Sequence, residues 1–387
     1  MKRIKQIIFR ALLAIAAIIA ALVCLKALHT HRNMSNIGSF DTEKDDILRR
    51  SNYLRERLLV SPQAIIDAMP SSVGRQFQGE WAIYACSMYS RALVNIANLY
   101  PETKDEALET AGCLIEEVLS PEIRQYDADR WHEDPLESIG SGHSHISYFA
   151  HLAWMIGGYK ALGGGIEYDS LYDDLCRDMS KNIENSPIHN VETYPGEVVY
   201  VPDMLVAIAA LEQYSRTHNG LYHNTVRDWM TIMKERFTNK KTGLIMSYVS
   251  DYFDDSPLKG SYSAVNTYFL TQVDEDFARQ QYECLKKYFF LAKPMAGVKE
   301  YFDKNCWFGM DYDAGPVIMN LSPSGTAFAI GPISYFGDNE LRKSFLKSGE
   351  IAATTITHKE QSHYLLADIA IVGEAVVLAM RTEHPRP

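Results

Sequence analysis

The chain has 387 residues, of which 47% are hydrophobic and 22% are charged, and its formal net charge is −11 at pH 7. This composition is typical of a globular protein with a large core. Nucleic-acid-binding proteins concentrate Lys and Arg in patches, and here basic residues are concentrated only in the first ten positions, which argues against a nucleic-acid partner. The six cysteines contain no C-x-x-C pair, so neither a zinc ribbon nor a dense disulfide framework is expected.

The first element in chain order is an apolar N-terminal segment. Four basic residues lie within the first ten positions and precede an uninterrupted apolar run over residues 11–25. With residues 7–9 included, the run has nearly the ~20 residues that a bilayer-spanning helix needs. Positive charge before the run favours a cytoplasmic N-terminus and an exported domain.

A cleaved signal peptide is the alternative for this segment. No small-x-small cleavage site follows the run, because Cys24, Leu25 and Lys26 break that pattern, so we favour an uncleaved anchor. We therefore expect residues 1–32 to form a cytoplasmic basic stub and a single-pass membrane anchor. Residues 33–387 would then form one domain on the periplasmic or extracellular side.

Helical periodicity dominates the rest of the chain. An apolar segment, a short break and a more polar segment follow one another repeatedly, and a final apolar segment over 363–381 would pair with the amphipathic segment 41–60. Alternating patterns typical of short strands occur only within 190–201 and 241–252. The other expected pairs are 79–99 with 102–119, 145–162 with 170–183, 202–214 with 222–237, 261–272 with 274–290, and 316–336 with 339–353.

The apolar segments recur with a period that indicates a fold. Their starts are spaced by roughly 50–65 residues, as in proteins built from repeated helical hairpins. Each hairpin has an apolar face that only its neighbours can cover. Because there are six hairpins, we predict a closed all-α (α/α)6 toroid with the apolar helices as the inner wall. An open α-solenoid is the alternative.

In such a ring, the loops that lead into the inner helices meet at one end, which we call the mouth. Most of these loops and first turns combine Gly, Tyr and a polar or acidic residue, whereas few outer-helix starts do. The mouth is therefore the expected substrate site. The residues predicted to line it are Trp81, Tyr84, His145, Ser147, Tyr200, Tyr262 and Asp311, with Tyr312 as a further phenol.

Three histidines, His143, His145 and His151, lie within nine residues at the start of one inner segment. A metal-binding pair at i and i+4 would need a histidine at position 147, where Ser147 stands, and H-E-x-x-H is absent. We therefore expect no metal and no cofactor. A neutral histidine in a cavity can transfer protons near neutral pH, so His151 is the leading catalytic candidate, and a hydrogen-bonded core histidine is the alternative.

A catalytic histidine needs an acid or base partner. Asp203 follows Pro202 at an expected helix start, and Asp313 precedes "AGP" at another. Carboxylates at such positions commonly act as helix caps, which is the alternative role for both. Tyr148, in the same first turn as the histidines, completes the predicted catalytic set. The remaining acidic candidates at the mouth are Glu80, Glu133 and Glu197.

Three stretches resemble proteins that carry a linalool dehydratase/isomerase-like domain. They are "ISYFAHLAWMIGGY" (146–159), "EVVYVPDMLVAIAAL" (197–211) and "DYDAGPVIMNLSPSGTAFAIG" (311–331), and the likeness covers about residues 79–353. The resemblance implies an (α/α)6 fold. It also implies cofactor-free dehydration and allylic isomerisation of a terpene alcohol by a histidine, cysteines and tyrosines in an apolar cavity.

The family histidine falls on His151, although Ala150 replaces the glycine before it. The paired family cysteines do not carry over. Tyr200 and Ala209 stand about where they are expected, and no cysteine lies between Cys176 and Cys284. This departure weakens the implied terpene chemistry and leaves the substrate open.

These observations favour a membrane-anchored enzyme that eliminates water from, or isomerises, a small hydroxyl-bearing molecule by acid–base chemistry. A glycan-active (α/α)6 hydrolase or lyase is the first alternative, supported by the acidic charge and by Trp81, Trp131 and Trp307 near the mouth. A non-catalytic binding or scaffold protein at the membrane surface is the second. The expected partners are a small-molecule substrate and the membrane, and a homo-oligomer is compatible with the sequence.

Overall fold

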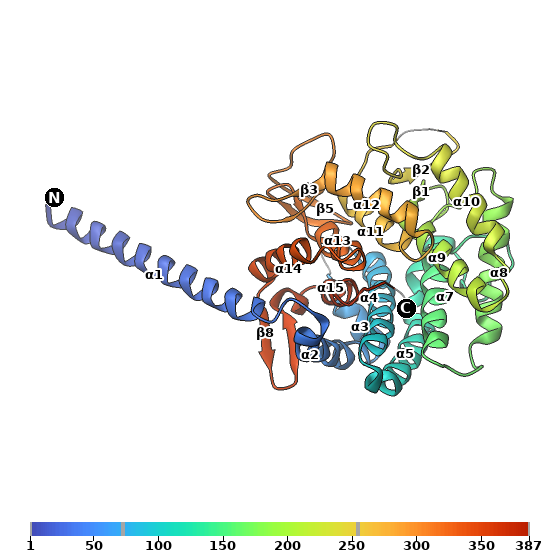
Figure 1. Ribbon diagram of the computed structural model, residues 1–387, viewed down its shortest axis with the longest axis horizontal. Coiled ribbons are helices and arrows are strands. Elements are labelled where there is room, and N and C mark those ends of the chain that lie inside the picture. The colour runs from blue at the N-terminus through green and yellow to red at the C-terminus, as the bar shows by residue number, and fades with distance from the viewer. Residues whose placement is uncertain (1, 71–73, 253–255, 386–387) are drawn as a thin grey trace.

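The inner wall of the fold consists of the apolar segments expected from the sequence. The computed structural model describes residues 2–70, 74–252 and 256–385. Each inner helix packs against the next, and the last returns to the first, so the ring is closed (Figure 1). This confirms the (α/α)6 toroid and excludes the open solenoid. The inner helices are α4 (Arg75–Leu99), α7 (Ile146–Ala161), α9 (Val201–Thr217), α11 (Gly260–Leu270), α13 (Pro323–Tyr335) and α15 (Ile371–Arg381).

The outer wall consists of the amphipathic segments. In α10, for example, Val226, Trp229, Met230 and Met233 are buried at helical spacing. In the inner helix α7, by contrast, every residue from Ile146 to Tyr159 is buried. The outer helices, in the order of their inner partners, are α5 (Lys104–Val118), α8 (Asp169–Asn185), α10 (His223–Glu235), α12 (Glu275–Phe289), α14 (Asn339–Ala353) and α2 (Phe40–Leu58).

The first and last helices of the ring, α2 and α15, pair with one another as the sequence predicts, and this contact closes the ring. Buried ion pairs join these helices to α14. The Glu43 carboxylate accepts hydrogen bonds from Arg342 at 2.5 and 2.8 Å and from Arg381 at 2.8 Å. Arg50 and Glu374 form a second buried pair at 2.5 Å.

Strands are more extensive than the sequence indicates. The two segments with alternating patterns each contribute one strand, β1 (Val199–Tyr200) and β2 (Tyr248–Val249), and these two strands pair with one another antiparallel. A five-stranded antiparallel sheet and the hairpin of β8 (Thr355–His358) and β9 (Gln361–Tyr364) were not predicted. The sheet has the order β3 (Phe290–Leu291), β4 (Gly297–Lys299), β7 (Leu321–Ser322), β6 (Gly315–Ile318) and β5 (Phe308–Asp311).

These strands shorten two of the expected helices. The prediction of a helix from residue 316 is wrong, because β6 and β7 occupy its first part and α13 begins at Pro323. Met319 and Asn320, between these strands, have φ of 52° and 68°. This left-handed conformation does not fit within a continuous right-handed helix. Likewise α15 begins at Ile371 rather than 363, because β9 and the 3-10 turn η3 (Leu365–Asp368) precede it.

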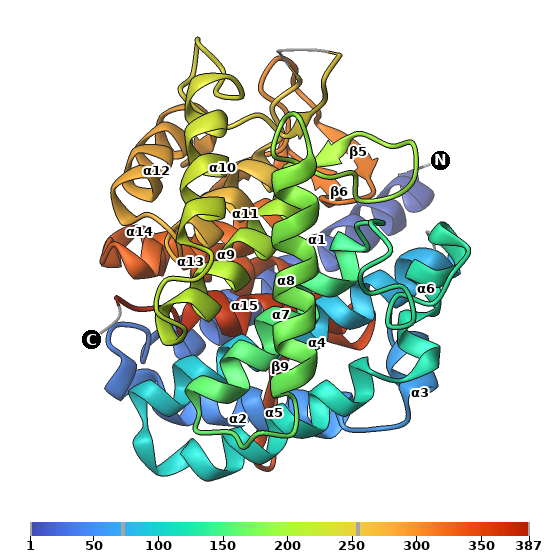
Figure 2. The same ribbon diagram turned by 90° about the vertical axis from the view of Figure 1, so that its right-hand side faces the viewer.

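Two short helices were also not predicted, α3 (Pro62–Asp67) and α6 (Pro121–Trp131). Ser120 is the N-cap of α6, and its hydroxyl accepts a hydrogen bond from the Ile123 amide. His132, with φ of 60°, is the C-cap. The loop that follows leads into α7. In Figure 2, α6 and the β5–β6 hairpin lie on the same side of the ring, opposite the C-terminus.

Helix α1 (Lys2–Met34) extends away from the ring (Figure 1). Its segment Phe9–Met34 is long and apolar enough to cross a membrane, a test that a signal sequence also passes. The C-terminal end of α1 packs on α14. There, Lys26 Nζ donates to the Glu350 carbonyl at 2.8 Å and Asn33 Nδ2 donates to Glu350 Oε1 at 2.9 Å.

Candidate active site at the mouth of the ring

The N-terminal parts of two inner helices present carboxyl groups that are only partly buried. On α4, Glu80 and Tyr84 keep partial exposure while Ala82 and Ile83 between them are buried. On α9, Asp203 is partly exposed although both of its neighbours are buried. Their side chains therefore provide polar surface in an otherwise apolar wall.

A single loop holds both carboxyl groups. Thr193 Oγ1 donates to Asp203 Oδ2 at 3.0 Å, and the hydroxyl of the next residue, Tyr194, lies close enough to Glu80 to lower its pKa. The Tyr194 hydroxyl also lies 3.2 Å from Ser147 Oγ on α7. The two carboxyl groups thus lie beside consecutive residues of one loop, and the charge of Asp203 acts on Glu80, although the two come from α4 and α9.

The environment changes the acidity of this pair. Burial raises the pKa of Glu80 to about 8, and the charges of Asp203 and Asp313 add to the effect. Burial likewise raises the pKa of Asp203 to about 7, against the hydrogen bond from Thr193, and Asp313 again adds to it. Near neutral pH, Glu80 therefore keeps its proton while Asp203 titrates. A proton donor beside a group that can accept one is what acid–base catalysis requires.

A cationic centre adjoins the pair. Lys259, just before α11, donates to Asp311 Oδ1 at 2.8 Å and to Asp313 Oδ2 at 2.6 Å. Burial alone would lower the pKa of Lys259, but the charge of Asp313 and the neighbouring carboxylates raise it, so the amine stays protonated. Gly260, the first residue of α11, lies close to the backbone of Lys299 in β4. A Cβ at this position would lie 1.9 Å from the Lys299 carbonyl oxygen, so only glycine fits there.

Tyrosine side chains surround these charges. The ring of Tyr262 lies 5.3 Å from that of Tyr248 and 6.4 Å from that of Tyr200, between ring centroids. Burial raises the pKa of Tyr262 and of Tyr84 well above the ordinary value. Their phenols therefore stay protonated and can donate hydrogen bonds to a substrate, but they cannot act as bases near neutral pH.

Several predicted site residues thus lie in one neighbourhood with Glu80. Asp203 is in the first turn of α9, as expected. Asp313, by contrast, does not precede a helix, because it lies in the turn between β5 and β6. Its carboxylate still accepts a hydrogen bond from Lys259, and its charge acts on Glu80 and Asp203.

The other predicted catalytic residues are deeper in the wall. His151 is 2% exposed, and its Nδ1 lies 2.9 Å from Ser87 Oγ, while Nε2 has no partner among the described residues. Burial lowers the pKa of His151 to about 3, so its imidazole is neutral. Its ring centroid is 4.5 Å from that of Tyr84, which links it to the mouth. The Tyr148 hydroxyl donates to the Val118 carbonyl on α5 at 3.0 Å, outside the group around Glu80.

His145 and Trp81 also differ in their surroundings. His145 is fully buried and its ring contacts Asp127 and Glu133 rather than the Glu80–Asp203 pair. Trp81 is partly buried against the core. A pocket of about 160 Å³ lies between α2, α4 and α5, is lined by residues such as Arg55 and Tyr89, and contains none of the predicted site residues. Glu80 and Asp203 lie outside this pocket and keep partly exposed faces.

Glu80 was predicted from the sequence only as an acidic candidate at the mouth, and Thr193, Tyr194 and Lys259 were not predicted. A signal for Glu80 and Lys259 was present, because each is a charged residue next to glycine at the start of an apolar inner helix. Thr193 and Tyr194 lie in a loop without a periodic pattern, so nothing in the sequence indicates which carboxyl groups they contact.

Comparisons with known proteins concern the fold. No protein-family model matches the sequence, and no curated protein matches it. An unsaturated glucuronyl hydrolase specific for heparin is similar in structure at 11% identity and a TM-score of 0.49, over 87% of this chain and 96% of that one. A polysaccharide lyase is similar at 12% identity and a TM-score of 0.48, over 83% of this chain and 97% of that one. The resemblance to linalool dehydratase/isomerase-like proteins stays a prediction.

Proposed function

We propose that this chain is a glycan-active hydrolase or lyase in which Glu80 and Asp203 are the acid–base pair. The observation that carries the proposal is the convergence of these two partly buried carboxyl groups, with pKa values of about 8 and about 7, on one loop. Hydrolysis and elimination of a glycosidic bond both need an acid for the leaving oxygen and a base for water or a C–H proton.

The roles follow from the order of the two pKa values. Glu80 holds its proton at neutral pH and would protonate the leaving oxygen. Asp203 ionises more readily and would act as the base, with Thr193 fixing one of its oxygens. Tyr84, Tyr262 and Lys259 offer hydrogen-bond donors to hydroxyl or carboxylate groups of a sugar, and such donors suit a polyhydroxylated substrate better than a hydrocarbon.

One observation favours the second candidate, elimination of water from a small alcohol or its isomerisation. The buried His151 has a ring nitrogen without a partner in the described structure and lies beside Tyr84. Screening the full chain in detergent against oligosaccharides and against prenyl alcohols separates the two functions. Binding of oligosaccharides without any turnover would instead favour a non-catalytic binding protein.

Substitution of the carboxyl pair tests the leading proposal. We expect Glu80→Gln and Asp203→Asn each to lower kcat on the oligosaccharide found in the screen by on the order of 10²–10⁴-fold, the usual contribution of a general acid or base. Circular dichroism checks that the fold is kept. The matched control is Glu137→Gln, at an exposed position, which should leave kcat unchanged. Equal activity of the wild type and both variants would refute the assigned roles.

We also propose that α1 anchors the protein in a membrane, with the N-terminus in the cytoplasm and the ring, within residues 33–387, on the periplasmic or extracellular side. The exposed apolar side chains of α1 support this, since residues such as Leu12, Ile18 and Leu22 are 59–60% exposed. The basic residues that precede them support the orientation.

A further inference from the structure

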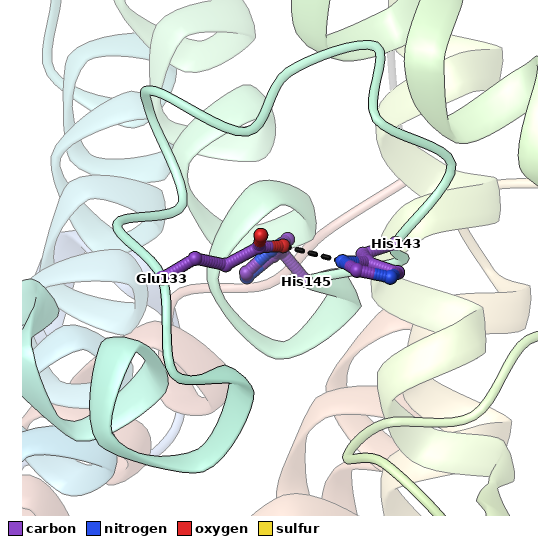
Figure 3. A group of neighbouring side chains, drawn as sticks. All are labelled: Glu133, His143 and His145. Atoms are coloured by element: carbon purple, nitrogen blue, oxygen red, sulfur yellow. Dashed lines mark hydrogen bonds and ion pairs between the residues drawn. The ribbon is translucent and has the colours of Figure 1, made fainter.

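The loop between α6 and α7 brings together three side chains of metal-binding type. Glu133 Oε1 lies 2.5 Å from His143 Nδ1 and 3.0 Å from His145 Nε2. All three potential ligand atoms lie within 4.8 Å of one another. Figure 3 shows Glu133 and His143 pointing toward one another across the loop, with the His145 ring next to the carboxylate.

A buried carboxylate orients one of the two imidazoles. The other ring nitrogen of His145, Nδ1, lies 2.5 Å from Asp127 Oδ2, and both side chains are fully buried. A proton on Nδ1 donated to Asp127 leaves the lone pair on Nε2, which is directed at Glu133. Histidines that bind metal commonly donate their second N–H to a carboxylate in this way, which fixes the tautomer and increases the basicity of the ligand.

The surrounding contacts hold the loop in this arrangement. The Trp131 ring lies 4.9 Å from the His145 ring and 5.5 Å from the His143 ring, between centroids. Asn182 Nδ2 donates to the His143 carbonyl at 3.1 Å. The His145 backbone has φ of 42°, an uncommon value for a residue other than glycine. The two imidazoles are therefore positioned by contacts other than those with Glu133.

We propose that Glu133, His143 and His145 bind one zinc-type divalent cation, with Asp127 as the supporting carboxylate. Two imidazoles and one carboxylate are a donor set suited to Zn²⁺, whereas Ca²⁺ and Mg²⁺ prefer oxygen ligands throughout. The side chains of His143 and Glu133 are 54% and 31% exposed, so water can reach the remaining coordination positions.

This site lies outside the Glu80–Asp203 pair and does not depend on the proposed function. The sequence predicts no metal, because an i, i+4 histidine pair is absent from α7. The ligands proposed here come instead from a loop and from the residue at the N-cap position of the helix.

Zinc binding to the full chain in detergent, after treatment with EDTA, tests the proposal. We expect isothermal titration calorimetry to give a stoichiometry of one Zn²⁺ per chain. Bound Co²⁺ should give a visible absorption spectrum typical of four- or five-coordination. His143→Ala and Glu133→Gln, at partly exposed positions, should abolish both signals while circular dichroism stays unchanged.

Two further variants sharpen this test. Asp127→Asn should weaken zinc binding by on the order of 10–100-fold, as expected for loss of a supporting carboxylate. His358→Ala, at an exposed histidine in β8, is the matched control and should leave affinity unchanged. Absence of stoichiometric binding to the wild type, or equal binding to the wild type and His143→Ala, would overturn the proposal. The cluster would then be an imidazolium held between two carboxylates.

Discussion

At Glu80, the environment that suits a general acid lowers the stability of the fold. In the folded state the pKa is about 8, whereas in the unfolded chain the carboxyl is solvated and has its ordinary value of 4.5. Unfolding therefore releases a proton between these pH values, and this group destabilises the native state increasingly as pH rises from 4.5 to 8. Below 4.5 the carboxyl is neutral in both states and the effect vanishes.

We therefore predict that Glu80→Gln is more stable than the wild type at pH 8, by on the order of a few kcal/mol, and equally stable at pH 4. Denaturant unfolding at the two pH values measures the difference, and Glu137→Gln is the matched control. An equal free energy of unfolding of Glu80→Gln and wild type at pH 8 would show that the native carboxyl ionises normally.

His151 makes the stability of the native state depend on pH in the opposite direction. Its pKa is about 3 in the folded state, against an ordinary value of 6.5, because burial disfavours the imidazolium. The unfolded chain binds a proton below pH 6.5 and the native state does not. The native state is thus destabilised as pH falls below 6.5, by about 2 kcal/mol at pH 5.

His151→Ala should remove this part of the pH dependence between pH 7 and 5, which thermal or denaturant unfolding can measure, with His358→Ala as the control. The same variant decides the role of the imidazole. If His151 is catalytic, as the sequence indicates, turnover is lost while the melting temperature at pH 8 is kept. A lower melting temperature with turnover retained would assign it to the core.

At the scale of elements, the ring depends on the contact between α2, α14 and α15. Burial alone would raise the pKa of Glu43, but Arg342 and Arg381 hold it below the ordinary value. The stabilisation from this carboxylate is therefore present above pH 4.5 and is lost as pH falls through the lowered pKa of the folded state.

We predict that Glu43→Gln lowers the free energy of unfolding at pH 7 by about 3–5 kcal/mol, because the buried Arg342 loses its counter-ion and Arg381 keeps only Asp46. Asp41→Asn, at an exposed position of the same helix, should cost well under 1 kcal/mol, the usual effect of a surface charge near a helix terminus. Urea denaturation compares the two, and similar losses for both variants would contradict the buried role of Glu43.

The helices were predictable because burial on one face leaves a periodic pattern in the sequence. The bounds of α14 were predicted to the residue. The prediction at residues 316–322 failed because a short apolar run fits a strand as well as a helix turn, and the pairing of β6 with β7 decides between them.

The candidate site was partly predictable for a related reason. Asp203, Tyr200 and Tyr262 were found because inner-helix starts converge at the mouth. Tyr194 lies in a loop and Glu80 on α4, and His145 lies at the end of the loop that joins Asp127 on α6 to α7. Such contacts depend on packing between segments that have no common pattern in the sequence.

For the whole molecule, the arrangement of α1 leads to a prediction about localisation. If α1 is an uncleaved anchor, the full-length chain should stay in the membrane fraction after alkaline carbonate extraction, and protease added outside the cell membrane should digest the ring and spare the N-terminal stub. Deletion of residues 1–25 should release the chain into the soluble fraction. An isolated protein whose N-terminus lies beyond the apolar run would show that the segment is a cleaved signal.

The pairing of α2 with α15 also determines when the protein can fold. Helix α2 precedes and α15 follows the other helices of the ring in the sequence, so the ring stays open until α15 has been synthesised. Until then, the apolar flank of α4 that α15 later covers is open to solvent and to other chains. That flank is therefore prone to association with other apolar surfaces during the interval between the synthesis of the first helix of the ring and that of the last.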